Sequence, residues 1–328
     1  MKTPAIIVAT ALLSQAAFAD GHEDRTGWPE SFTVATASQG GTYFAYGSGW
    51  ANLVAEELGI SGGGEVTGGP GQNMALVHTG DAQFGMTTMG PAAEAIAGES
   101  PIAPGLQMTN SCAMFPMYQT PFSVTTLASS GITAIAEIPE GARIGFGPAG
   151  STSDTYFPRM MDTLGVNYER RNGSWSDLGG QLQDGLLDVI AFAAGVPVPA
   201  VSQLEVQTDV NIIEFTAEEQ ATIMETFPVA AYAIAESTYS TLQADARSVS
   251  MWNFAIANCD LPNSFVKAVV DIIMSDNERM MNIHKAARTT VPENWDKNGG
   301  VIAWHPGAAE WFIENAGADI PADQIHSK

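Results

Sequence analysis

The sequence predicts an α/β fold of two lobes, each with a mostly parallel sheet flanked by helices, and a cleft between the lobes. Short apolar strands alternate with glycine turns and helices, which is the order typical of parallel sheets. The same order begins again after a second turn-rich region, as expected for a second lobe. The chain has 328 residues, which is more than one small core requires and suits two lobes.

Residues 1–19 have the pattern of a secretory signal peptide. Met1 and Lys2 give a short positive start, residues 4–13 are almost wholly apolar, and Ala17-Phe18-Ala19 supplies an A-x-A cleavage site. The apolar run is too short for a comfortable transmembrane helix. We therefore predict cleavage after Ala19 and export to the periplasm, as a monomer with no direct membrane insertion.

The first part of the first lobe, 31–123, follows a loose polar leader over 20–30. A helix is predicted over 45–58, because the apolar side chains from Trp50 to Leu58 fall on one face. The other predicted elements are strands at 32–37, 65–67 and 81–86, a glycine turn at 62–64 and a helix at 72–79.

The second lobe, 124–228, repeats the alternation. A continuous apolar strand at 186–193 is typical of a strand covered on both faces. A strand at 144–146 and helices at 154–164 and 178–184 complete this lobe. The segment 229–328 returns to the first lobe, with a strand at 249–257 and closing helices at 265–274 and 308–315.

The chain is strongly acidic, with 36 Asp and Glu residues against 13 Lys and Arg residues and a net charge of −23. Removal of Lys2 with the leader makes the net charge −24. Such a charge repels nucleic acid and anionic membrane surfaces, so we expect neither as a partner. It would also repel a small anion, which a local group of N–H donors would then have to attract.

The cysteines and histidines give little support for metal chemistry. Cys112 and Cys259 are the only cysteines, and an exported compartment permits a disulfide between them. Their long separation leaves the pairing open, and two buried thiols are the favoured interpretation. The five histidines have no metal-ligand spacing, so we predict no metal and no cofactor.

A run of small hydroxyl residues, from Gly150 through Ser151, Thr152 and Ser153 to Asp154, lies where a strand leads into a helix. The unpaired N–H groups and the dipole at a helix start favour a bound anion. Taken alone, the run is better explained as a helix cap.

Two junctions in the first lobe have the same character. One is Ser38-Gln39-Gly40-Gly41-Thr42-Tyr43, where Thr42 offers a hydroxyl and Tyr43 a ring and a phenol. The other runs from Thr67 to Asn73. Three such strand–loop–helix junctions predict a cleft that recognises carboxylates and hydroxyls through N–H and O–H donors.

These motifs resemble, in their order, the TAXI subfamily of extracytoplasmic solute receptors from TRAP (tripartite ATP-independent periplasmic) transporters. The resemblance runs from Phe32 to Gly317, and Gln72, Thr152, Ser153 and Asp154 depart from the family pattern. The segments that carry it are Gly40-Gly41-Thr42-Tyr43, Thr67 through Asn73, Thr79 through Gly85, Gly147 through Asp154, Leu182 through Asp188 and His305-Pro306-Gly307-Ala308.

The resemblance implies a periplasmic binding protein of type II-like fold, whose lobes close on a small ligand without catalysis. It implies a small anionic ligand, such as glutamate, 2-oxoglutarate or a related dicarboxylate or oxo acid. It further implies delivery of that ligand to a TRAP-type membrane permease. By position, Thr42, Tyr43 and Asn73 would bind from the first lobe and residues 150–153 from the second. The threonine at 152, where relatives carry glycine, would alter the ligand preference.

Weaker candidates complete the predicted site. Thr87, Thr88 and Met89 end a strand that could line the cleft, and Trp175 could be a lid aromatic or a surface anchor. Gly195 and Pro197 lie in a loop that faces the cleft in relatives. None of Arg159, Arg170 and Arg171 is assigned to the ligand, although anion receptors often use a guanidinium; Arg159 is expected on the surface.

Two other functions compete with the solute receptor. A periplasmic module that presents its ligand to a membrane kinase would have the same lobes, and the chain alone does not separate the two. An exported hydrolase needs a nucleophile with a base, and the sequence contains no G-x-S-x-G motif. Paired carboxylates remain open as hydrolytic groups, although abundant acidic residues usually form a solvated surface. We therefore expect a receptor and not an enzyme.

Overall fold

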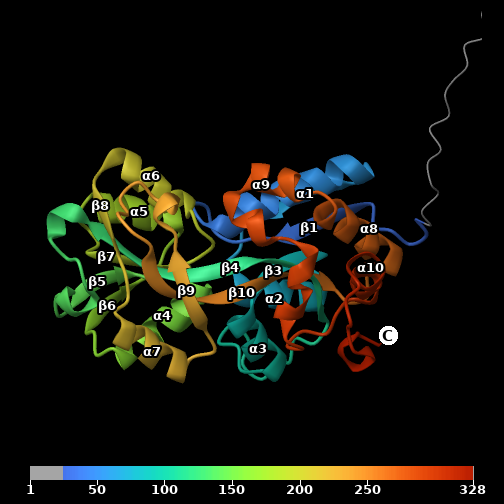
Figure 1. The fold of residues 1–328 in the computed structure, drawn as a ribbon. Helices are drawn as coiled ribbons and strands as arrows, with labels where there is room; N and C mark the ends of the chain where they lie inside the picture. Colours follow the sequence, from blue (N-terminus) through green and yellow to red (C-terminus); the bar gives the residue numbers. More distant parts are fainter. Residues whose placement is uncertain (1–24, 328) are drawn as a thin grey trace, which may run out of the picture.

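The computed structural model describes residues 25–327, so the predicted leader at 1–19 lies outside the described residues. Figure 1 shows two lobes joined by two long strands that run from one lobe into the other. These crossing strands are β4 (Ser111–Leu127) and β10 (Ala246–Asn258), which pair antiparallel to each other. The register of this pair shifts between Trp252 and Phe254, which marks an irregularity in the middle of β10.

The first lobe has the strand order β2-β1-β3-β10-β4, with β1 (Ser31–Ala35), β2 (Ser61–Glu65) and β3 (Phe84–Thr88) parallel to one another. Its core holds buried residues from Phe32 to Tyr118 and again from Phe254 to Ile320. The helices of this lobe are α1 (Thr42–Leu58), α2 (Pro70–Thr79), α3 (Met89–Ala97), α8 (Asn263–Met274), α9 (Asn277–Ile283) and α10 (Pro306–Ala316).

The second lobe is built on parallel strands β5 (Ala142–Gly145), β6 (Tyr168–Arg171) and β7 (Val189–Ala193). β7 and β8 (Val210–Ile213) pair antiparallel to β4, and β9 (Ala230–Ile234) pairs antiparallel to β10. The helices of this lobe are α4 (Thr152–Thr163), α5 (Trp175–Gln183), α6 (Pro199–Gln207) and α7 (Ala217–Thr226).

The hydrophobic cores locate the points where the chain changes lobe. Along β4, Tyr118 packs in the first-lobe core and Phe122 in a second-lobe core. Along β10, Met251 packs in the second lobe and Phe254 in the first. The return that the sequence placed from residue 229 onward therefore occurs inside β10, and Ile234 of β9 still packs with the second lobe.

The prediction of a glycine turn at 62–64 is wrong, because these residues belong to strand β2. Each of them pairs with β1 in register, and Gly62 lies opposite Phe32. A Cβ atom on Gly62 would come within 2.2 Å of the Phe32 ring. Glycine is present here because the neighbouring ring occupies the space of a side chain, and the chain extends without turning.

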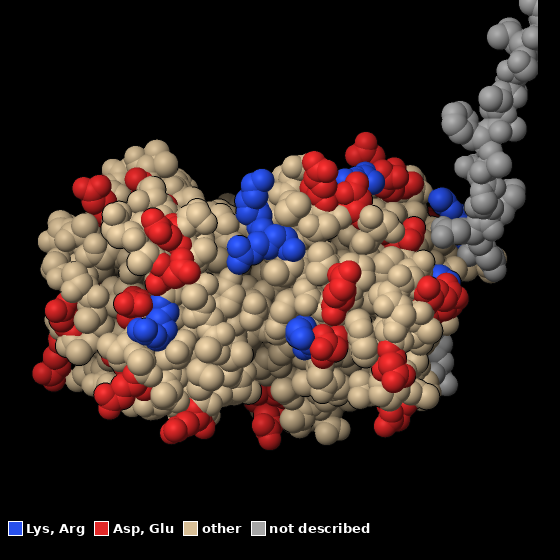
Figure 2. All heavy atoms as spheres, viewed as in Figure 1, with Lys and Arg blue, Asp and Glu red and all other residues tan. Residues whose placement is uncertain are grey.

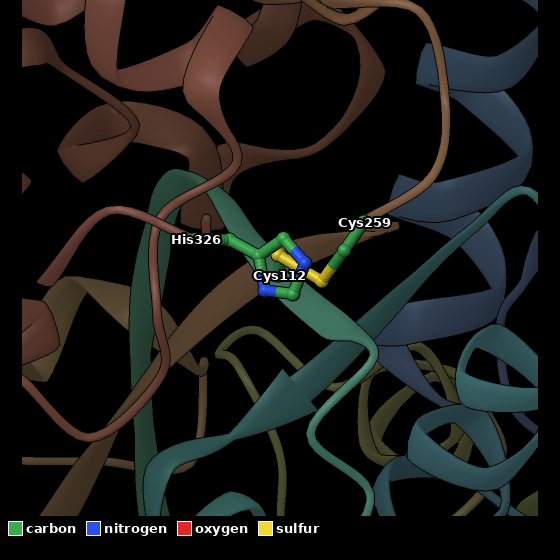
Figure 3. Close-up of side chains that lie close together, drawn as sticks. All are labelled: Cys112, Cys259 and His326. Atoms are coloured by element: carbon green, nitrogen blue, oxygen red, sulfur yellow. A yellow bond between two sulfur atoms is a disulfide. The ribbon is translucent and has the colours of Figure 1, made fainter. Parts of the chain in front are cut away.

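The two cysteines form a disulfide, which corrects the expectation of two buried thiols. Cys112 at the start of β4 and Cys259 directly after β10 have Cα atoms 5.2 Å apart. Figure 3 shows His326 beside this bond. Both sulfur atoms are engaged in the disulfide, so neither offers the thiolate that a metal ion requires. Among the described residues, no helix is long and apolar enough to cross a membrane.

Candidate functional site

A cavity of about 30 Å³ lies between the lobes. It holds roughly one or two water molecules, so a solute requires the lobes to move apart. Of the residues predicted from the sequence, those that line it are Gly41, Thr42, Tyr43, Thr88, Ser151, Thr152 and Trp175. The remaining lining residues are Ala37, Gly68, Gly69, Pro70, Thr120, Pro148, Ala193 and Ala194.

The start of α1 contributes backbone donors from the first lobe. Its N-cap is Gly41, which has no side chain to cap the first turn. No described residue accepts a hydrogen bond from the backbone N–H groups of Thr42 and Tyr43. Because Thr42 and Tyr43 line the cavity, these free donors and the positive end of the helix dipole lie at its wall.

The start of α4 supplies the matching donors from the second lobe. Ser151 is the N-cap, and its hydroxyl accepts a hydrogen bond from the Asp154 N–H at 3.1 Å. The backbone N–H groups of Thr152 and Ser153 have no acceptor among the described residues. Ser151 therefore caps the helix, and two further N–H groups stay free, so anion binding at this run stays a prediction.

Several hydrogen bonds cross between the lobes and hold them closed. The Thr42 hydroxyl donates to the carbonyl of Gly195, and the Thr152 hydroxyl donates to the Thr88 hydroxyl at 2.8 Å. Backbone bonds run from Ser176 to Gln39 at 3.3 Å, from Ala200 to Gly40 at 3.0 Å and from Gly71 to Gly150 at 3.4 Å. On the α3 and α4 side, Arg159 Nη1 lies 2.7 Å from Glu94 Oε1.

The side chain of Asn253 binds the hydroxyl groups at the first-lobe face of the cavity. Asn253 Oδ1 accepts hydrogen bonds from the Tyr43 phenol at 2.6 Å, from Thr88 at 2.8 Å and from Thr120 at 3.0 Å. Its Nδ2 donates to the Tyr118 carbonyl at 2.6 Å and to the Thr120 hydroxyl at 2.8 Å. The Asn253 side chain is fully buried, and burial also raises the pKa of Tyr43, so this phenol stays protonated.

Trp175 closes one side of the cavity. The indole is only 4% exposed and stacks on Phe192 with 4.4 Å between the ring centroids. A Cβ atom on Gly41 would lie 2.8 Å from the Trp175 ring, so the indole contacts the start of α1 across the cleft. Trp175 is thus an interlobe aromatic contact at the cavity.

No charged side chain lines the cavity among the described residues. Arg170 instead pairs with Asp154, and its Nη2 donates to the Asp154 carbonyl at 3.2 Å. Pro158 has no N–H for that carbonyl, so Arg170 replaces the missing helical bond. Arg171 pairs with Glu169. Neither Arg170 nor Arg171 lines the cavity.

The net charge of −23 gives the molecule no general attraction for an anion. On the face shown in Figure 2, acidic side chains are spread over both lobes, and Lys and Arg side chains also gather at the boundary between the lobes. Within the cavity, an anion would be attracted by the two helix starts, each equivalent to about half a positive charge. Together they balance about one carboxylate.

Three first-lobe candidates lie outside the cavity. Asn73 is fully buried, and its amide donates to the carbonyls of Thr36 and Met86, so it ties neighbouring strand ends together. Thr87 is buried beside the cavity residue Thr88 and pairs with β10. Met89 packs against the first-lobe core.

The remaining second-lobe candidates also do not line the cavity. The Gly150 N–H donates to Asp154 Oδ2 at 2.9 Å, and the Ser153 hydroxyl accepts from the Ala193 N–H at 2.6 Å. Gly195 contributes the carbonyl that accepts from Thr42. Pro197 follows a cis peptide bond, and its carbonyl binds the imidazole of His284.

Sequence reasoning missed Thr120 and Asn253, whereas Thr88 was one of its weaker candidates. Thr120 and Asn253 lie within strands, and the site was sought at strand ends and at the loops that follow them. The sequence did contain one indication of a role for Asn253, because this residue is an amide inside the predicted apolar strand at 249–257. A buried amide in such a strand needs partners for every donor and acceptor.

The chain belongs to the NMT1-like family, whose model matches residues 34–316. Its fold is shared with solved periplasmic binding proteins of low sequence identity. The structure of periplasmic binding protein BugD aligns with a TM-score of 0.58 at 14% identity, over 88% of this chain and 99% of BugD. No curated protein sequence matches this chain.

Two other solved structures contain a bound acid. Rpa4515 of R. palustris with adipate aligns with a TM-score of 0.58 at 15% identity, covering 88% of this chain and 98% of that one. MatC from Rhodopseudomonas palustris with bound malate aligns with a TM-score of 0.55 at 14% identity, covering 86% of this chain and 97% of MatC. These likenesses confirm the two-lobed α/β fold that the sequence predicted.

Proposed function

We propose that this protein is a periplasmic solute receptor that captures a small carboxylate by lobe closure and delivers it to a TRAP-type permease. One observation carries the proposal: the starts of α1 and α4, from opposite lobes, present free N–H groups to the same cavity. An anion placed there would bind both lobes at once, and its binding would favour closure.

Three further observations support the proposal. MatC and Rpa4515 hold malate and adipate in the same fold. The disulfide suits an oxidising compartment such as the periplasm. The motif order resembles the TAXI receptors, for which glutamate, 2-oxoglutarate and related acids are the typical ligands. No hydrolytic pair of carboxylates lines the cavity among the described residues, and we propose a receptor and not an enzyme.

A ligand panel tests this function. Thermal unfolding of the mature protein is measured with millimolar glutamate, 2-oxoglutarate, malate, adipate and, as a neutral control, glucose. A micromolar ligand at millimolar concentration stabilises the folded state by about 4 kcal/mol, which raises the unfolding temperature by several degrees. Stabilisation by glucose with none by any acid would contradict the carboxylate proposal, and turnover of a bound acid would contradict a receptor.

A further inference from the structure

The orientation of the Asn253 amide is fixed by the backbone. The Tyr118 carbonyl can only accept a hydrogen bond, so the atom that faces it at 2.6 Å must be the amide nitrogen. The opposite atom, Oδ1, therefore faces Tyr43 and Thr88 and can only accept. Both hydroxyl groups lie within hydrogen-bond distance of Oδ1 and of each other, so their hydrogen atoms are used within this group.

This arrangement means that the hydroxyl oxygens of Tyr43 and Thr88 present only lone pairs to the cavity. Tyr43 and Thr88 both line the cavity, and each has a single hydroxyl hydrogen, which is already used. The bonds to Asn253 do not cross the cleft, so opening of the lobes leaves them in place. In the closed structure the Thr152 hydroxyl crosses the cleft and donates to Thr88 at 2.8 Å. A ligand that separates the lobes would take this place, and it would need a hydrogen to donate.

The donors of the cavity lie elsewhere. Free N–H groups lie at the starts of α1 and α4, and the indole N–H of Trp175 also belongs to the cavity lining. The Thr42 and Thr152 hydroxyls are released when their interlobe bonds open. Because no charged side chain lines the cavity among the described residues, these donors suit one carboxylate. The cavity thus has a donor side for the carboxylate and an acceptor side formed by Tyr43 and Thr88.

We infer that Asn253 is a positioning residue that makes Tyr43 and Thr88 acceptors, so that the receptor selects small 2-hydroxy or 2-amino acids over 2-oxo acids. This inference rests on the proposed function and narrows its ligand class. A 2-hydroxy or 2-amino group donates to the Thr88 and Tyr43 oxygens. A 2-oxo group places a lone pair against them, and the oxygens remain without a hydrogen-bond partner.

Matched acids test the inference by calorimetry on the mature protein. L-lactate is compared with pyruvate, and L-glutamate and 2-hydroxyglutarate with 2-oxoglutarate, so that each pair differs at one carbon. We expect the acids with a donor to bind at least about tenfold more tightly than their oxo partners. Equal or tighter binding of the oxo acids would overturn the inference and leave the proposed function standing. Binding of none of these acids would overturn the inference, and the proposed function would fall as well only if malate and adipate also failed to bind.

Two neighbouring threonines provide a variant and its control. Thr88→Val removes an acceptor oxygen from the cavity and should reduce the preference for the donor-bearing acid to less than about threefold. Thr87→Val alters an equally buried residue that does not line the cavity, and it should keep the full preference. Unchanged selectivity in Thr88→Val would refute the acceptor role of that oxygen.

Asn253 itself is tested through selectivity and not through affinity alone. Asn253→Ala frees the hydrogens of Tyr43 and Thr88, so pyruvate should gain affinity relative to L-lactate. Asn253→Asp, whose buried carboxyl group is expected to be protonated, donates its O–H to the Tyr118 carbonyl and keeps an acceptor oxygen, so it should restore the preference for L-lactate. A purely structural role would weaken both acids equally in each variant, and that result would overturn the inference. If Asn253→Ala does not fold, the Thr88→Val and Thr87→Val pair decides.

Discussion

The hydroxyl of Thr152, at the start of α4, donates a hydrogen bond to the hydroxyl of Thr88, at the end of β3, with 2.8 Å between the oxygen atoms. Both side chains are buried, and each belongs to a different lobe. This bond therefore forms only when the lobes are closed, because a movement that separates the lobes at the cavity breaks it.

Thr152→Val should shift the ligand-free protein toward the open state. The change removes one interlobe hydrogen bond of about 1 kcal/mol, which corresponds to roughly a fivefold change in the ratio of closed to open molecules. Small-angle X-ray scattering should show a larger radius of gyration than for the wild type. Thr155→Val, in the same helix but away from the cavity lining, is the control and should not change it. An unaltered radius in Thr152→Val would mean that other contacts suffice for closure.

Gly40→Ala should prevent full closure. A Cβ atom at Gly40 would lie 2.7 Å from the backbone nitrogen of Ser176 in the other lobe, and Gly40 has φ +81°. We expect ligand affinity to fall at least about tenfold, because the clash exists only in the closed state. Gly59→Ala is the matched control, since Gly59 also has a positive φ but has no atom within 4 Å of the added Cβ. It should lose stability without losing affinity; equal affinities in the two variants would count against the clash.

Protonation of His284 should destabilise the folded protein. Burial lowers the pKa of His284, and its hydrogen bond to the Pro197 carbonyl opposes part of this effect. The unfolded chain therefore binds the proton at a higher pH than the folded chain does. The stability contributed by neutral His284 is fully present above about pH 6.5 and is lost as the pH falls through the lower, folded-state pKa.

The measurement for His284 is the unfolding temperature between about pH 7.5 and pH 5. His284→Gln should flatten this dependence compared with the wild type, because the titrating group is absent. His326→Gln removes a histidine beside the disulfide and serves as the comparison. A slope in His284→Gln as steep as that of the wild type would assign the pH dependence to other groups.

Reduction of the disulfide should lower stability substantially. Cys112 and Cys259 are separated by 147 positions in the sequence, so the bond closes a long loop in the unfolded chain. Such a bond typically contributes about 2–4 kcal/mol, mainly by constraining the unfolded state. Addition of a reductant should lower the urea midpoint of the wild type and leave a Cys112→Ser and Cys259→Ser double variant unaffected. A reductant-insensitive wild type would show that the bond is absent or without effect.

The sequence predicted the architecture well because strands and helices alternate and glycine-rich turns mark their ends. The predicted helices at 45–58 and 154–164 correspond to α1 and α4, although both begin two or three residues earlier in the structure. The early starts have a physical cause, since Thr42 and Thr152 carry polar side chains that give no apolar periodicity. Those first turns are the parts that face the cavity.

The site was predictable only in part, for a different reason. Thr42, Tyr43 and Ser151 follow strands at glycine-rich junctions, where local sequence signals a ligand contact. Asn253 acts through partners that are far away in the sequence, such as Tyr43 and Thr88. Local patterns do not contain such contacts, because only the pairing of β10 with β3 and β4 brings these residues together.

The disulfide also restricts how the lobes can move. It joins β4 and β10 at the outer end of the first lobe, so the two strands cannot slide past each other there. We therefore expect opening to bend the strand pair between the lobes, in the region where the register shifts beside Asn253. The bend would then lie directly beneath the cavity, and a solute bound there would act on it without any relay through the lobes.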